Sequence, residues 1–229
     1  MTSSPLTIGI PIFPQADLLD IAGPYEVFTQ QFSKVYLIAA DMQPVKTSGG
    51  MKLVPDYTFD DAPKLTLLVV PGGPGQIRMM TSRRYIAYLK AAAESASHVM
   101  GVCTGALLLA AAGLLDGHEA TTHWDSLPCL NLFPRVSVSP GYPRYVISGT
   151  RITTSGVSAG IDGALEVVAL LAGDEAAKEV QLLIQYAPQP PFDDGDPMSA
   201  EPVVYRKVEQ GLKKTQQTRI KQIIRLLKL

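Results

Sequence analysis

Charged residues, cysteine, histidine and long apolar runs are all scarce in this sequence. Charged residues make up 18% of 229 residues, below the roughly 25% of an average soluble domain. Since 20 basic and 21 acidic residues leave a formal net charge of -1, no global field draws the chain to nucleic acid. The longest apolar run, residues 106–115, covers 10 residues, whereas a membrane-spanning helix needs about 20. Hydrophobic residues still reach 46%, which indicates a folded protein with a large core.

The few cysteines and histidines limit the chemistry that the chain can perform. Two cysteines, Cys103 and Cys129, cannot build a disulfide scaffold, and no cysteine–histidine cluster has the spacing of a metal site. The N-terminal residues lack the basic segment and long apolar segment of a signal peptide. We therefore expect a cytoplasmic enzyme or binding domain without a metal.

Strands and helices are expected to alternate along the chain, which predicts an α/β fold with a mostly parallel sheet covered by helices on both faces. Strands are predicted at 6–13, 34–40, 65–71 and 98–102, hairpins at 44–59 and 136–154, and helices at 21–30, 83–95, 104–115, 159–172, 176–186 and 202–229. We expect one domain, 1–229, in which a loop and a C-terminal helical extension occupy about 188–229. The basic last helix could suggest nucleic-acid or membrane binding, but its apolar residues favour a buried stripe and a solvated basic face.

The segment HVMGVCTGALLLAAAGLL, residues 98–115, carries the strongest functional signal. A strand ending in Gly-x-Cys-x-Gly, followed at once by a helix, is the pattern of a nucleophile elbow. Gly101 and Gly105 leave room where strand and helix meet, and the helix N-terminus favours a thiolate at Cys103. We therefore predict Cys103 as a nucleophile. The alternative is a small buried apolar residue.

Two further segments could complete a site at the carboxyl edge of the sheet. Gly72 and Gly73 follow a predicted strand, and with the backbone N–H groups of Cys103 and Thr104 they could form an anion-binding hole. A tight turn is the alternative for these glycines. Asp20 lies in the apolar segment LLDIAGP, where desolvation would raise its pKa toward neutrality and allow proton transfer. The alternative for Asp20 is an acid at a helix start.

None of the three histidines is an obvious partner for the elbow cysteine. His98 lies at the far end of the same strand, and His118 lies in a loop that we expect to be solvated. His123 could lie near the site, although packing beside the neighbouring tryptophan is the favoured interpretation. Cys129 lacks the elbow pattern and is expected in the core.

These motifs together resemble the ThiJ/PfpI superfamily, and within it the isonitrile (isocyanide) hydratases. The resemblance rests on GVCTGALLLAAAGLLDG, HEATTHW, LLDIAGP, VVPGGPG and VQLLIQYAPQPPF and covers nearly the whole chain. It implies a flavodoxin-like sandwich, a homodimer, a nucleophile at Cys103 and an acid at Asp20. Thr104 stands where peptidases of the superfamily carry histidine, which disfavours a peptidase. A glutaminase needs a late histidine, and none follows His123.

The expected activity is the hydration of isocyanides to N-substituted formamides through a thioimidate on Cys103, with Asp20 giving and taking protons. This chemistry needs no metal or organic cofactor. The expected partners are a small-molecule substrate and a second copy of the chain, without nucleic acid or membrane. Two alternatives stay open: another cysteine enzyme, glyoxalase-like or chaperone-like, and a non-catalytic ligand-sensing domain related to AraC-type regulators, which share the subgroup.

Overall fold

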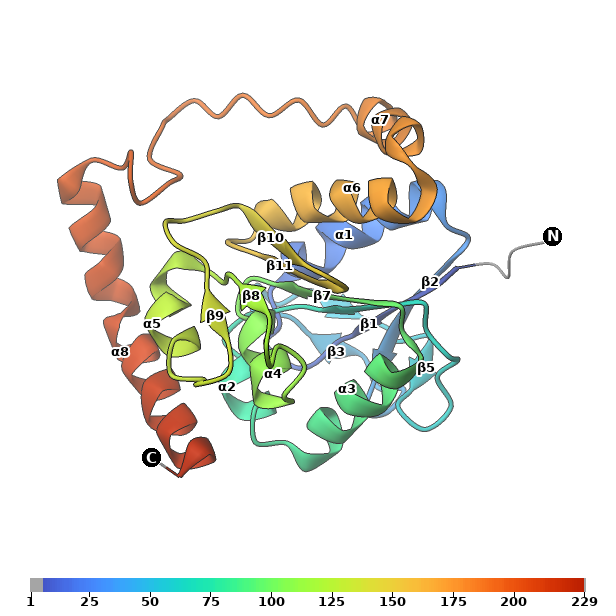
Figure 1. The fold of residues 1–229 in the computed structure, drawn as a ribbon, viewed down its shortest axis with the longest axis horizontal. Coiled ribbons are helices and arrows are strands. Elements are labelled where there is room, and N and C mark those ends of the chain that lie inside the picture. The colour runs from blue at the N-terminus through green and yellow to red at the C-terminus, as the bar shows by residue number, and fades with distance from the viewer. Residues whose placement is uncertain (1–5, 229) are drawn as a thin grey trace.

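A seven-stranded sheet forms the centre of the computed structural model, which describes residues 6–228 (Figure 1). The strand order is β10-β11-β7-β6-β1-β2-β5, and each neighbouring pair is parallel except β10 and β11. The strands are β1 (Thr7–Pro11), β2 (Lys34–Ala39), β5 (Tyr57–Thr58), β6 (Leu67–Val70), β7 (His98–Val102), β10 (Tyr145–Ser148) and β11 (Arg151–Thr154). The mostly parallel sheet confirms the predicted fold class.

Helices cover both faces of this sheet, as predicted. α1 (Leu18–Gln31) and α6 (Ala159–Ala172) lie on one face, and α3 (Arg83–Ser95) and α4 (Gly105–Ala111) lie on the other (Figure 1). The remaining helices are α2 (Gln76–Met79), α5 (Leu127–Leu130), α7 (Asp174–Leu183) and α8 (Pro202–Leu227), with a 3-10 turn η1 (Trp124–Ser126) before α5. Because both faces are covered, the central strands are mainly apolar, and all four residues of β6 are buried.

The two predicted hairpins form in different ways. In the first, β3 (Val45–Lys46) pairs antiparallel with β4 (Lys52–Leu53), but the two strands make a separate small sheet, and β5 alone continues to the edge of the main sheet. In the second, β10 and β11 pair antiparallel as predicted. A further small sheet joins β8 (Glu119–Ala120) to β9 (Ser137–Val138) in parallel.

Helix boundaries differ from the prediction at two places that matter for the site. α1 begins at Leu18, three residues before the predicted start, so Asp20 lies inside its first turn. α4 ends at Ala111, because Gly113 adopts a positive φ of 74° and the chain turns there. The short α4 brings residues 119–126 back toward the elbow.

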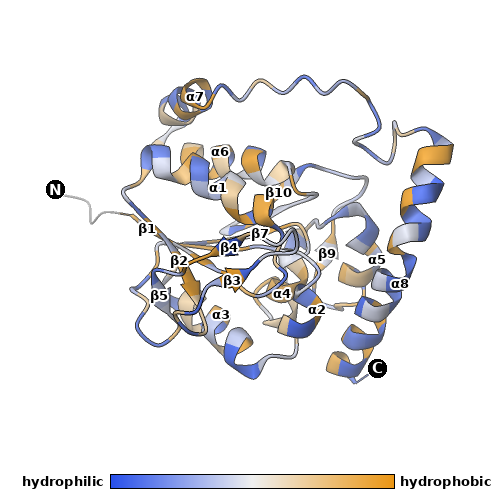
Figure 2. Cartoon of the chain, turned by 180° about the vertical axis from the view of Figure 1, so that it is seen from behind, coloured by the Kyte–Doolittle hydropathy of each residue, from blue (hydrophilic) through white to orange (hydrophobic). Residues whose placement is uncertain are grey.

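The C-terminal helix packs along only part of its length. In its second half Ile223 is buried, but near its start Val203, Val204 and Val208 are exposed, so the predicted buried stripe does not run the whole length. Figure 2 shows hydrophilic and hydrophobic residues alternating along α8. Within the described residues, no helix is both long and apolar enough to cross a membrane.

Candidate active site

Cys103 sits at the turn between β7 and α4, which is the predicted elbow. Its φ of 54° lies in the left-handed region that non-glycine residues seldom adopt, so the sharp turn carries backbone strain. The strain is held by neighbours: the Cys103 N–H donates to the carbonyl of Thr154 at 3.2 Å, and the Thr122 hydroxyl donates to the Cys103 carbonyl at 2.7 Å. A Cβ on Gly105 would collide with the carbonyl oxygen of Val70, so only glycine fits there.

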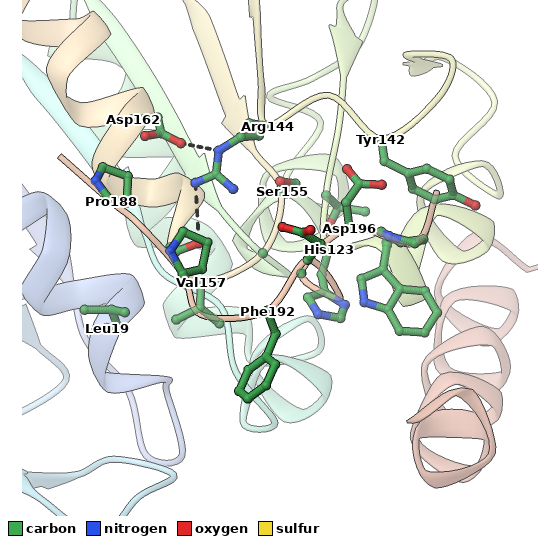
Figure 3. A pocket seen from close by; sticks show the side chains of 18 of the residues that line it. Leu19, His123, Tyr142, Arg144, Ser155, Val157, Asp162, Pro188, Phe192 and Asp196 are labelled. Carbon is green, nitrogen blue, oxygen red and sulfur yellow. Dashed lines mark hydrogen bonds and ion pairs between the residues drawn. The ribbon is translucent and has the colours of Figure 1, made fainter. Parts of the chain in front are cut away.

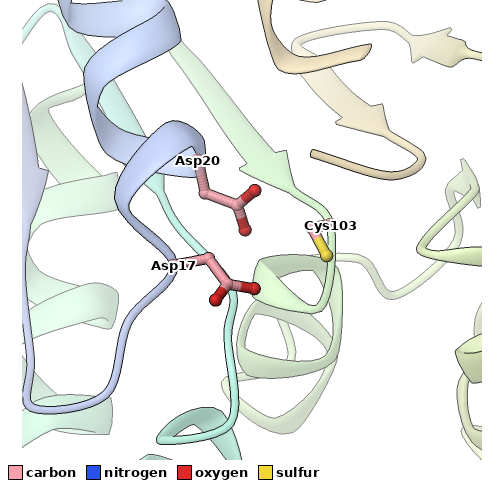
Figure 4. Close-up of side chains that lie close together, drawn as sticks. All are labelled: Asp17, Asp20 and Cys103. Atoms are coloured by element: carbon pink, nitrogen blue, oxygen red, sulfur yellow. The ribbon is translucent and has the colours of Figure 1, made fainter. Parts of the chain in front are cut away.

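Asp20 faces Cys103 from the first turn of α1 (Figure 4). Its side chain is 0% exposed, and Oδ2 accepts a hydrogen bond from the Gly72 N–H at 2.9 Å. Burial, followed by the nearby Asp17 carboxylate, raises the pKa of Asp20 from 3.8 to about 7, although the Gly72 N–H and the Cys103 thiol partly offset this. The predicted rise in the pKa of Asp20 is thus confirmed, and the group can exchange protons near neutral pH.

The thiol of Cys103 is more deeply buried than the sequence suggested. It is 4% exposed, and burial, followed by the charge of Asp20, raises its pKa well above the usual value. The Thr104 N–H hydrogen-bonds the sulfur and lowers that pKa in part. The expected thiolate-favouring effect of the helix N-terminus is therefore outweighed by desolvation, and the thiol must lose its proton to a neighbouring group before it attacks.

Gly72 and Gly73 have a different role from the expected anion hole. The Gly72 N–H is donated to Asp20, and the Gly73 N–H is donated to the Thr104 hydroxyl at 2.9 Å. The Cys103 N–H is also taken, by a backbone carbonyl on β11. The turn after β6 therefore positions the acid and the threonine instead of presenting free N–H groups to a ligand.

Asp17 is a site residue that the sequence analysis missed. A carboxylate oxygen of Asp17, one of Asp20 and the Cys103 sulfur all lie within 4.8 Å of one another (Figure 4). Asp17 Oδ1 also accepts from the Ser48 hydroxyl at 2.5 Å. The signal was available, because two acids three residues apart at a helix start lie on one side of the helix.

Two carboxylates and a thiol are also a donor set for a divalent cation. A metal would need the ionised forms of these groups, whereas the raised pKa values of Asp20 and Cys103 favour their protonated forms. Proton exchange is therefore the chemistry that this cluster suits best.

The histidines lie largely as expected. His98 begins β7, at the end away from Cys103. His118 is half-buried instead of solvated, and its Nδ1 lies 2.9 Å from the carbonyl oxygen of Ser148. His123 caps η1, where its Nδ1 accepts from the Asp125 N–H at 3.4 Å; burial and the charge of Arg219 lower its pKa to about 4, so it is neutral at pH 7.

The second cysteine is set apart from this chemistry. Cys129 is 0% exposed in α5, and its thiol lies 3.9 Å from the Gln216 carbonyl oxygen. Burial raises its pKa to about 11. These properties match the core residue that the sequence analysis expected.

Figure 3 shows a cavity of about 920 Å³ that is lined by residues next to the cluster but not by Asp17, Asp20 or Cys103 themselves. Its lining includes Leu19, next to Asp20 in the chain, and Thr122, whose hydroxyl holds the Cys103 carbonyl. His123 lines it as well, and the loop between α7 and α8 contributes Phe192 and its neighbours. The cavity therefore reaches residues in direct contact with the Asp20–Cys103 pair.

Polar residues line another part of the cavity. Arg144 and Asp162 form an ion pair, and the Tyr186 hydroxyl donates to Asp162 at 2.7 Å. The positive charge of Arg144 is thus neutralised within the lining.

Comparison with known proteins finds relatives both in sequence and in structure. The chain is 42% identical over 200 residues to isonitrile hydratase from Pseudomonas putida, which covers 87% of this chain and 86% of that protein. It is 29% identical over 191 residues to the HTH-type transcriptional regulator GbdR of Pseudomonas aeruginosa, 80% of this chain but only 51% of the regulator. Among solved structures, a ThiJ/PfpI family protein from Pseudomonas syringae superposes with a TM-score of 0.91 at 31% identity, covering 96% of this chain and 91% of that one.

The family model of the DJ-1/PfpI family matches residues 7–170, which include β1, the elbow and most of α6. Family membership agrees with the topology of the sheet, with the strained cysteine after β7 and with the similarity to the hydratase. The chain belongs to the DJ-1/PfpI family.

Proposed function

We propose that this protein hydrates isocyanides to N-substituted formamides, with Cys103 as nucleophile and Asp20 as the proton-transfer group. The observation that carries the proposal is the buried Asp20–Cys103 pair, in which the pKa of Asp20 lies at about 7. The 42% identity to an isonitrile hydratase supports the choice of substrate class. Within residues 6–228, neither side chain forms an ion pair with a cation.

In the first half of the reaction, the Cys103 sulfur forms a bond to the terminal carbon of the isocyanide. The thiol proton passes to Asp20, and a proton is delivered from Asp20 to the same carbon, where the carbon lone pair accepts it. The product is a thioimidate, R–N=CH–S–Cys103. Sulfur and hydrogen have added to one carbon, and no oxidant or metal is needed.

In the second half, water adds to the thioimidate carbon. Asp20 takes a proton from the water and passes it to the nitrogen, which gives the tetrahedral intermediate R–NH–CH(OH)–S–Cys103. The carbon–sulfur bond then breaks, the sulfur regains a proton, and the hydroxyl loses its proton to leave the formamide R–NH–CHO. Water has been added overall, and Cys103 and Asp20 return to their starting protonation states.

The surrounding residues suit these steps. The Thr104 N–H stabilises negative charge on sulfur, and the Gly72 N–H holds the Asp20 carboxyl in place. The Thr104 hydroxyl accepts from Gly73 and can donate its own hydrogen toward the substrate nitrogen. The cavity beside the pair, with Leu19 and Phe192 in its lining, favours an apolar R group.

Formamide formation from cyclohexyl isocyanide tests the proposal directly. Cys103→Ser should abolish turnover, since a hydroxyl is too weakly acidic to be ionised here. Asp20→Asn should lower kcat by about 10²–10⁴-fold, the usual value of a positioned proton-transfer group. Asp20→Glu keeps a carboxyl at a displaced position and should retain part of the rate.

Cys129→Ala is the matched control, because it removes the other cysteine in a region away from the cluster. It should keep the wild-type kcat/KM. A Cys103→Ser protein that turned over isocyanide at the wild-type rate would contradict the proposal, as would an Asp20→Asn protein with full activity.

A second candidate is a ligand-sensing role without catalysis. The similarity to the regulator GbdR and the size of the cavity favour it. Saturable isocyanide binding by calorimetry, with no formamide formed over hours, would support this candidate against the hydratase. A glyoxalase-like activity would instead appear as consumption of methylglyoxal by the wild-type protein and not by Cys103→Ser.

A further inference from the structure

Arg219 is the one buried cation among the described residues 6–228. It lies on α8, is 7% exposed, and projects into the body of the protein while other basic residues of the helix, such as Arg206 and Lys213, are exposed. This placement departs from the expectation of a wholly solvated basic face. Burial of a guanidinium destabilises the fold unless its N–H groups form hydrogen bonds. The hydrogen-bond partners of Arg219 therefore show which segments it connects.

One side of the guanidinium binds Gln76, the first residue of α2. Arg219 Nε donates to Gln76 Oε1 at 3.2 Å, and Gln76 is itself 0% exposed. The Gln76 N–H donates to the Gly73 carbonyl at 3.1 Å, and the Gly73 N–H donates to the Thr104 hydroxyl at 2.9 Å. A continuous set of hydrogen bonds therefore runs from Arg219 to the residue after the nucleophile.

The other side of the guanidinium holds η1. Arg219 Nη1 donates to Asp125 Oδ2 at 3.2 Å and to the Ser126 hydroxyl at 3.1 Å. The Ser126 N–H donates to the His123 carbonyl at 2.7 Å, and the adjacent Thr122 hydroxyl donates to the Cys103 carbonyl at 2.7 Å. This second route ends on the nucleophile itself.

We propose that Arg219 is a positioning residue that clamps the turn at residues 72–76 to the segment at residues 122–126, and so fixes the strained backbone of Cys103 and Thr104 from both sides. The proposal deepens the proposed function, because it makes the C-terminal helix part of the active site. Gln216, one turn earlier on α8, supports the clamp: its side-chain nitrogen donates to the Asp125 carbonyl at 2.6 Å. A guanidinium suits this task, since its planar fork reaches several acceptors at once and an ammonium does not.

The clamp also brings a positive charge close to the site. The charge of Arg219 lowers the pKa of Cys103 and of His123, which favours the thiolate during attack and keeps the imidazole neutral. Its partner Asp125 is also buried and offsets part of this positive charge. The titratable groups near this part of α8 are His123, Asp125 and Cys129 from the packed elements and Glu209 from α8 itself.

Cys103 alkylation by iodoacetamide tests the clamp without using isocyanide turnover. The rate is measured at pH values from 7 to 9.5 by peptide mass mapping, in the wild type, Arg219→Met, Arg219→Lys and the exposed control Arg206→Met. Arg219→Met should shift the profile to higher pH and lower the rate at fixed pH, because the cation that favours the thiolate is lost. Arg219→Lys should restore most of that rate because it keeps the charge, and Arg206→Met should match the wild type.

Kinetics of the same proteins separate positioning from charge. Arg219→Lys, which cannot reach Gln76 and Asp125 together, should lower kcat about tenfold or more with little change in KM, because a displaced nucleophile is slower but the cavity is intact. Gln76→Met cuts one arm, keeps the cation and should show a smaller loss of the same kind. If no protein of the series turned over isocyanide, the wild type included, the proposed function would be refuted. The alkylation rates would then decide the role of Arg219.

The proposal is overturned if folded Arg219→Met alkylates with the wild-type profile. If Arg219→Met does not fold, the kcat values of Arg219→Lys and Gln76→Met test the proposal instead. Wild-type kcat in both would show that Arg219 serves stability alone.

Discussion

Asp20 should make the protein less stable as pH rises, and Asp20→Asn should remove that dependence. The pKa of Asp20 is raised in the folded state, from 3.8 to about 7, because burial disfavours the carboxylate. Between these two values the folded protein holds a proton on Asp20 that the unfolded chain has lost. Unfolding then releases a proton, so the free energy of unfolding falls as pH increases.

The size of the effect follows from the shift. A difference of about three pKa units corresponds to about 4 kcal/mol in total, since each unit is worth about 1.4 kcal/mol. The loss is spread over the window from about pH 4 to pH 7, with the slope declining near pH 7 as the folded carboxyl begins to ionise. From pH 5 to pH 7 we expect the free energy of unfolding to fall by about 2 kcal/mol on account of Asp20 alone.

Urea unfolding of the wild type and of Asp20→Asn at pH 5, 6, 7 and 8 measures this. The comparison must be between the two proteins, because other groups titrate in the same range; His123, whose pKa is lowered to about 4, makes the folded state lose stability as pH falls below 6.5. The stability of Asp20→Asn relative to the wild type should rise by about 2 kcal/mol between pH 5 and 7 and change little above pH 8. A difference that stayed constant across the series would refute the buried, proton-holding Asp20 described above.

Three further predictions concern the cysteines, the elbow and assembly. Peroxide should oxidise Cys103 faster than Cys129, increasingly so toward high pH, because Asp20 can take the proton of the Cys103 thiol whereas the Cys129 thiol lies beside a backbone carbonyl. Faster modification of Cys129 in peptide mass maps would contradict this. Gly105→Ala should lower the free energy of unfolding by about 1–3 kcal/mol or more, since its Cβ would press on the Val70 carbonyl, and an unchanged Tm would show that the elbow yields freely. We also expect a homodimer, because Val203, Val204 and Val208 leave an apolar surface on α8; sedimentation at micromolar concentration that gave only the 24.6 kDa monomer would exclude it.

Local sequence patterns predicted most of the elements and singled out Cys103 and Asp20 as candidate site residues. Apolar runs predicted β6 and β7 because strands buried on both faces show no alternation, and the glycines around Cys103 predicted the elbow because the close approach of strand and helix admits no side chain. The apolar neighbours of Asp20 predicted its raised pKa for the same local reason. These signals lie within a few residues of the group they describe.

Tertiary structure decided what surrounds that pair. The depth of burial of Cys103 depends on β11, α1 and the turn after β6 together, so the sequence pattern overstated the influence of the helix N-terminus on its pKa. The N–H groups of Gly72 and Gly73 donate hydrogen bonds to Asp20 and Thr104, which lie 52 and 31 residues away in the chain. Arg219 lies more than 90 residues from Asp125 and 143 from Gln76, and a basic residue in a basic helix gives no local sign that it will be buried. Hydrogen bonds between distant segments have no periodicity in the sequence, and only the packing of α8 against η1 and α2 brings these groups together.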